Sequence, residues 1–108
     1  MDSERLNQAQ KGDVHYFNRY FDDAVREYST GIESNPDNAG LYYRRALSYV
    51  QLRDYDNAIV DLSKAIEMGP NLKEFYYVRG MLFEARKEYS KALWDYEKVA
   101  ELVGNGNN

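Results

Sequence analysis

The sequence predicts an all-α protein in which one supersecondary unit occurs three times. Similar residues recur 34 positions apart at several independent places. Each period contains two apolar stripes with helical spacing, separated by a short turn. A proline or a glycine stands where each period closes. We therefore expect three antiparallel helix-turn-helix repeats stacked in a right-handed superhelix, which is an α–α solenoid.

The period is visible in four columns of equivalent residues. These columns are Gly12, Ala46 and Gly80; Phe21, Tyr55 and Tyr89; Ala24, Ala58 and Ala92; and Pro36 with Pro70. They place the repeats at residues 5–38, 39–72 and 73–106 of a single domain that spans residues 1–108. The polar residues 104–108 are expected to form a short tail, with Gly104 in the place of the proline.

The second repeat shows how each period becomes two helices. One apolar stripe runs through residues 42–50 and another through residues 58–66. Between the stripes of the three repeats, equivalent positions hold Asp22, Asp56 and Ser90, whose side chains are expected to cap the second helices.

Small residues and repeat ends set the packing that we expect between helices. Asn35-Pro36 and Gly69-Pro70 should close the first two repeats, with Gly69 suited to a left-handed cap. The glycine and alanine column at Gly12 should meet the alanine column at Ala24, which lets the two helices of a repeat approach closely. Enlarging one of these residues should cost about 1–3 kcal/mol by overpacking.

Over nearly all of its length the chain resembles the tetratricopeptide repeat family. The second repeat is the closest match to the family's signature places, with Tyr42, Ala46, Tyr49, the run Asp54–Ile59, Ala65 and Pro70. The resemblance implies that the first helix of each repeat lines a concave surface that binds other proteins. It does not identify the partner, because one fold hosts many partners.

Composition and charge exclude several classes of function. The formal net charge is −4, whereas binding to nucleic acid needs a basic face. The chain has no cysteine, so it has neither a disulfide nor a thiolate site. No apolar run approaches the roughly 18 residues of a membrane span. Asp2 and Glu4 do not fit a signal peptide, so we expect a cytoplasmic protein.

The sequence offers no credible catalytic, metal or cofactor site. His15 is the single histidine, and its column mates Tyr49 and Phe83 indicate packing. The carboxylates of Asp22-Asp23 and of Asp54 with Asp56 lie at helix-starting turns and outside any calcium-binding loop. There is no glycine-rich phosphate loop. We therefore expect a protein that is not an enzyme and uses no cofactor.

The expected concave surface is the candidate binding site. Its residues are mostly aromatic or apolar with one arginine, a composition that is enriched at interface hot spots. The residues expected to bind a peptide are Asp13, Tyr16, Phe17, Tyr43, Arg44, Leu47, Tyr77 and Met81, and Val78 lies on the same stripe. The alternative is that Tyr43, Leu47 and Tyr77 only pack between repeats.

One branch of the family grips the C-terminal carboxylate of cytosolic chaperones with lysine, asparagine and arginine side chains. The resemblance places these clamp positions at Ala9, Asp13, Arg44, Glu74 and Val78, none of which keeps the required residue type. Asp13 and Glu74 would repel a carboxylate. We therefore expect weak or absent binding of chaperone tails.

The last helix has no following repeat to cover it, although solenoids usually end in a polar cap. A contiguous exposed apolar patch marks an interaction site. The residues expected on this docking or oligomer face are Leu93, Trp94, Ala100, Leu102 and Val103.

The favoured interpretation is a scaffold that binds a peptide segment or helix of a partner protein in its groove. Two alternatives stay open. One is a self-associating structural or adaptor module that uses the last helix, forming a homo-oligomer. The other is the targeting module of a larger enzyme. An excised fragment without its natural cap would also explain the apolar last helix.

Overall fold

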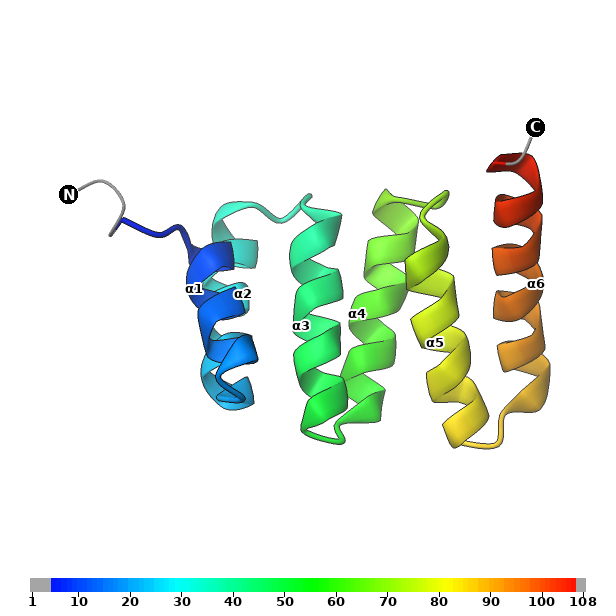
Figure 1. The fold of residues 1–108 in the computed structure, drawn as a ribbon, viewed down its shortest axis with the longest axis horizontal. Helices are drawn as coiled ribbons and strands as arrows, with labels where there is room; N and C mark the ends of the chain where they lie inside the picture. The colour runs from blue at the N-terminus through cyan, green and yellow to red at the C-terminus, as the bar shows by residue number, and fades with distance from the viewer. Residues whose placement is uncertain (1–4, 107–108) are drawn as a thin grey trace.

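A computed structural model describes residues 5–106 as three helical hairpins in a row (Figure 1). Each helix packs against the helices that precede and follow it in the chain, which gives an elongated body of 47 × 33 × 22 Å. This arrangement confirms the predicted helical repeats. The helices are α1 Gln8–Phe17, α2 Phe21–Ser34, α3 Ala39–Gln51, α4 Tyr55–Met68, α5 Lys73–Ala85 and α6 Tyr89–Gly106.

The first two hairpins begin at asparagine caps. The Asn7 side chain accepts a hydrogen bond from the Gln10 amide at 2.8 Å, and the Asn7 amide donates to the Gln10 side chain at 2.9 Å. The Asn38 side chain accepts from the Leu41 amide at 3.3 Å. These side chains satisfy amides that have no partner inside the helix, which fixes where α1 and α3 begin.

The residues predicted to cap the second helices lie inside those helices, so this prediction is wrong. Helices α2, α4 and α6 begin at Phe21, Tyr55 and Tyr89, which makes the second residue of each helix Asp22, Asp56 and Ser90, respectively. The cap of α4 is Asp54, whose side chain accepts from the Asn57 amide at 3.3 Å. Asp22 and Asp56 instead lie in the first turn, where a negative charge is favoured by the helix dipole.

The turn inside each hairpin holds a basic residue in the left-handed region. Arg19, Arg53 and Lys87 have φ values of 66°, 61° and 62°. After each of them the chain reaches back over the end of the first helix, as when the Asp54 amide donates to the Tyr49 carbonyl at 2.9 Å. The expected left-handed cap at Gly69 is absent, because Gly69 has φ −132°.

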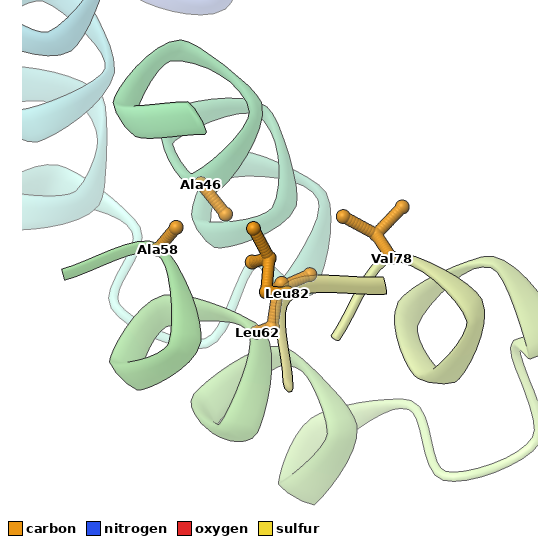
Figure 2. Packing of buried hydrophobic residues seen from close by; sticks show 5 residues of the cluster. All are labelled: Ala46, Ala58, Leu62, Val78 and Leu82. Carbon is orange, nitrogen blue, oxygen red and sulfur yellow. The ribbon is translucent and has the colours of Figure 1, made fainter. Parts of the chain in front are cut away.

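Figure 2 shows the buried cluster that joins the second hairpin to the third. Ala46, Ala58 and Leu62 are fully buried, and Val78 and Leu82 of α5 pack on them from the next repeat. Val78 is only 9% exposed. Its placement on the binding stripe was therefore wrong, because the side chain belongs to the core between repeats.

The glycine column makes room for aromatic rings. A Cβ atom on Gly12 would collide with the Tyr28 ring, and one on Gly80 would lie 2.8 Å from the Tyr96 ring. The second repeat carries Ala46 and Leu62 at these places, and both belong to one core cluster. The small residues of the first helices therefore face the column of Tyr28, Leu62 and Tyr96. In the second repeat Ala46 also shares its core cluster with Ala58 of the alanine column.

Two buried ion pairs tie the helices together. Arg45 Nε and Nη2 donate to the two Asp61 carboxylate oxygens at 2.8 Å. The third guanidinium nitrogen, Nη1, donates to the Ser29 hydroxyl of the preceding repeat at 3.0 Å. The Asp61 hydrogen bonds raise the pKa of Arg45. Arg79 makes the same contacts one period later with Asp95 and Ser63.

Helix α6 does not end at Gly104, since it continues to Gly106. The start of the expected polar tail is therefore helical, and residues 107–108 lie outside the described part of the chain. No helix of the described residues is long and apolar enough to span a membrane.

Candidate peptide-binding site

A pocket of about 420 Å³ opens between α1 and α3. It brings together six of the eight residues that the sequence suggested for peptide binding. Its lining is Asp13, Tyr16, Phe17, Tyr28, Gly40, Tyr43, Arg44 and Leu47. We call it the α1–α3 pocket. Its walls are mainly aromatic and apolar, as in sites that enclose a side chain of a ligand.

Aromatic contacts hold the pocket walls. The Tyr16 ring packs edge-on against Phe17 and Phe21, with centroid distances of 5.6 and 5.3 Å. The Tyr43 ring lies 5.0 Å from Phe75 of the third repeat, which fixes it from behind. Phe17 is 82% exposed. Of the four rings that line the pocket, Tyr16 and Tyr43 are thus supported by other rings, while Phe17 is the one most open to a ligand.

Opposite charges lie side by side at the pocket. The Tyr28 hydroxyl donates to Asp13 Oδ1 at 2.5 Å, and Arg44 Nε is 3.9 Å from the same oxygen. Burial, together with the hydrogen bond to Asp13, raises the pKa of Tyr28 above its usual range. Burial and the nearby Glu74 carboxylate raise the pKa of Tyr43. Both phenols are thus neutral hydrogen-bonding groups at physiological pH.

Tyr77 and Met81 lie outside this pocket, on α5. They are 50% and 41% exposed, and they occupy the positions of Tyr43 and Leu47 one period later. The Tyr77 ring lies 6.1 Å from the Tyr96 ring. The two residues therefore extend the exposed surface along the stack without lining the pocket.

The sequence reasoning missed Tyr28 and Gly40 as pocket residues. Tyr28 comes from a second helix, whereas the expected concave surface consists of first-helix residues, and its hydroxyl reaches Asp13. Gly40 leaves part of one wall open because it has no side chain, whereas the equivalent third-repeat position holds Glu74. The signal was available as a glycine in the first turn of a predicted helix.

The last helix carries the apolar exposure that the sequence suggested. Leu93, Trp94 and Val103 are 58%, 54% and 40% exposed, and Ala100 is also exposed. Leu102 is half-buried. Four of the five expected residues are thus open to solvent.

The single histidine lies apart from the pocket. His15 Nε2 is 3.9 Å from a Glu27 carboxylate oxygen. Within residues 5–106, no three histidine, aspartate or glutamate side chains gather closely enough to hold a metal ion. The pocket itself presents aromatic rings, hydrogen-bonding groups and two opposite charges.

Comparison with solved structures finds close relatives of this geometry. The first TPR of Spaghetti (RPAP3), solved bound to HSP90 peptide SRMEEVD, is similar with TM-score 0.86 and 28% identity, over 91% of this chain and 78% of that one. The TPR2B domain of yeast Sti1, solved as a pHsp70 complex, is similar with TM-score 0.87 and 29% identity, over 94% and 81%. MamA has TM-score 0.91 at 21% identity over 93% and 58%, which is a likeness of fold alone.

The sequence comparison agrees with these structures. No curated protein sequence matches the chain. The family model described as tetratricopeptide repeat matches residues 10–73 and again residues 43–107. Together with the peptide-bound neighbours, this match supports a protein-interaction module. The chain belongs to the tetratricopeptide repeat family.

Proposed function

We propose that the chain binds a peptide segment or helix of a partner protein through the α1–α3 pocket and the adjoining surface of α5. One observation carries the proposal: the pocket gathers Tyr16, Tyr43 and Leu47 into an apolar recess beside the Asp13 and Arg44 charges. Aromatic rings with an arginine are enriched among residues that dominate binding energy. An apolar ligand side chain would fill the recess.

The charged pair supplies orientation. Arg44 can donate to a carbonyl or carboxylate of the ligand, and Asp13 can accept from an amide or a basic side chain. Because the two charges already lie 3.9 Å apart, neither has to be desolvated alone when a ligand covers them. The neighbours solved with chaperone peptides support a peptide as the ligand, while the residues of this pocket set its own specificity.

The experiment is affinity capture from a native lysate, followed by mass spectrometry and titration of the captured partner. Phe17→Ala removes the most exposed ring, and Arg44→Glu reverses a half-exposed charge. Each should weaken binding by about 2 kcal/mol, roughly thirtyfold. Tyr43→Ala should do the same, with circular dichroism as the check because Tyr43 also packs on Phe75.

Matched controls change the same residue types elsewhere. Tyr89 on α6 is 62% exposed, and the Arg26 side chain on α2 is 72% exposed. Tyr89→Ala and Arg26→Glu should leave binding unchanged. Retention of the partner by Phe17→Ala, Tyr43→Ala and Arg44→Glu, with normal helical content, would move the binding site to another surface.

The proposed role needs no catalytic group. We also propose that the protein acts in the cytoplasm, as expected from the sequence. Fractionation of cells that express the tagged chain would test that setting.

A further inference from the structure

We propose that the open face of α6, formed by Leu93, Glu97, Ala100 and Val103, binds an amphipathic helix of a partner protein. That helix presents an arginine or lysine to Glu97 and apolar side chains to the other three residues. This surface is separate from the α1–α3 pocket, so the inference stands independently of the proposed function.

The two internal junctions between repeats give the template. Arg45 of α3 donates from Nη1 to the Ser29 hydroxyl of α2 at 3.0 Å. Arg79 of α5 donates from Nη1 to the Ser63 hydroxyl of α4 at 3.0 Å. Helices α2 and α4 are thus each covered by the next helix, which brings a guanidinium to the same place in the repeat.

The apolar residues around that position are covered in the same way. Ile59 and Ile66 of α4 are half-buried and pack against core clusters that contain Val78, Leu82 and Phe75 of α5. Leu93 and Ala100 hold the same places on α6, one period later, and both are exposed. The open face therefore has the apolar pattern of a covered junction.

Glu97 gives the open face its selectivity. It stands one period after Ser63, where the internal junctions place a hydroxyl opposite an arginine, and it is exposed. A carboxylate there would accept a charge-assisted hydrogen bond, which is stronger than a bond to a hydroxyl. A neutral or acidic residue at the matching place on the partner would leave this charge without compensation under the docked helix.

Trp94 does not belong to this face although it is 54% exposed. Its equivalent in the second repeat is Val60, which stays 64% exposed even though α5 covers α4. The Trp94 ring lies 6.2 Å from Tyr76 and beneath Lys98. It therefore faces outward from the stack and offers a control at the neighbouring position.

A second copy of the chain matches the charge of this face but not its apolar contacts. In a head-to-tail stack, α1 would cover α6 and bring Lys11, which stands in the place of Arg45 and Arg79, to Glu97. Asn7, however, stands where Leu41 and Phe75 supply the apolar contact at the internal junctions. Asn7 is also engaged in the cap of α1. In a symmetric pairing of two α6 helices, Glu97 of each copy would lie near that of the other, and like charges repel.

The test uses a hydrocarbon-stapled, fluorescein-labelled peptide with the sequence of residues 72–87, which carries Phe75, Val78, Arg79 and Leu82 in one helix. Fluorescence anisotropy on the full chain should show saturable binding that weakens as salt is raised. Leu93→Glu and Glu97→Lys should each reduce the affinity at least tenfold, whereas Trp94→Glu should leave it unchanged.

A charge swap makes the assignment specific. A second probe with Arg79→Glu should bind the wild-type chain weakly and should recover at least tenfold with Glu97→Lys. Absence of binding by the first probe, equal loss with Trp94→Glu, or failure of the swap would overturn the proposal. Sedimentation equilibrium tests whether the face binds a second copy of the chain instead. A wild-type dimer that Leu93→Glu dissociates would overturn the proposal and assign the face to that second copy.

Discussion

Arg79 of α5 and Asp95 of α6 form a two-bond ion pair inside the third hairpin. Arg79 Nε and Nη2 donate to the two Asp95 oxygens at 2.9 and 2.7 Å, and the Asp95 side chain is fully buried. The remaining Arg79 nitrogen, Nη1, reaches Ser63 of the preceding repeat. One guanidinium therefore fixes the two helices of a hairpin and also the step between hairpins.

We predict that Asp95→Ala destabilises the fold far more than Ser63→Ala. The first leaves the Arg79 charge buried without a partner and should cost about 3–5 kcal/mol. The second removes one neutral acceptor and should cost about 1 kcal/mol. Urea unfolding followed by circular dichroism measures both, with Glu33→Ala at an exposed position as the control. A loss below about 1 kcal/mol for Asp95→Ala would contradict the structural role of the pair.

The 34-residue period was sufficient to predict the helices and their order, because apolar stripes and small residues repeat with the period of the stack. It did not reveal the ion pairs. The signal was present as Arg45 with Asp61 and Arg79 with Asp95, each pair 16 residues apart. A helical pattern alone does not say which polar side chain turns inward, so neither pair could be assigned to the core from the sequence.

The candidate site was predictable in part for the same reason. The family resemblance implies that the first helices line one surface, so Tyr16 and Tyr43 could be assigned to that surface although they occupy different places in the repeat. Val78 could not, because Arg44 holds the same position one period earlier and remains exposed while Val78 is buried. Whether the side chain is polar or apolar decides if such a position is exposed or buried, and the apolar Val78 packs in the core between repeats. The contact of Tyr28 with Asp13 needed the side-chain geometry.

We predict that Gly12→Ala destabilises the first hairpin despite the better helix propensity of alanine. Alanine gains about 1 kcal/mol over glycine in a helix. Overpacking against the Tyr28 ring costs about 1–3 kcal/mol, and the hydrogen bond to Asp13 holds that ring in place. The free energy of unfolding should therefore fall by up to about 2 kcal/mol, as measured by thermal or urea unfolding.

The second repeat supplies the rescue for this variant. Ala46 and Leu62 already pack together at the equivalent places. Tyr28→Leu added to Gly12→Ala should therefore recover at least half of the loss. Gly104→Ala is the matched control, since nothing lies within 4 Å of a Cβ there, and it should be neutral or stabilising. Equal losses for Gly12→Ala and Gly104→Ala would show that the Tyr28 ring yields freely.

We predict that Tyr96→Phe makes the stability of the chain less sensitive to alkaline pH. Burial, followed by the hydrogen bond to Glu84 at 2.7 Å, raises the pKa of Tyr96 to about 12. An unfolded tyrosine titrates near pH 10, so between about pH 10 and 12 the folded chain holds a proton that the unfolded chain has lost. The stability from this group is complete below pH 10 and declines through that window.

The prediction is checked by measuring the unfolding midpoints of the wild type and of Tyr96→Phe at pH 9 and at pH 11.5. The wild type should lose more stability between the two values, while lysine deprotonation affects both proteins alike. Tyr89→Phe serves as the control because the Tyr89 side chain is 62% exposed. Identical losses in the wild type and Tyr96→Phe would contradict the coupling of this phenol to folding.

We predict that peptide SRMEEVD, which occupies the first TPR of Spaghetti (RPAP3), binds this chain weakly or not at all. The positions that the family resemblance assigns to the carboxylate clamp hold Ala9, Asp13, Arg44, Glu74 and Val78. Asp13 and Glu74 present carboxylates, and Val78 is buried in the core. An acidic peptide would also approach a chain whose formal net charge is −4.

Isothermal titration calorimetry at low salt should show no saturable heat with this peptide. Asp13→Asn combined with Glu74→Lys removes both opposing charges and introduces two donors, so it should increase the affinity at least tenfold, the factor that about 1.4 kcal/mol supplies. Glu33→Lys combined with Asp37→Asn makes the same charge change away from the pocket and should have little effect. A low-micromolar affinity of the wild type that disappears when the peptide C-terminus is amidated would mean that other residues of this chain, Arg44 first among them, bind the carboxylate.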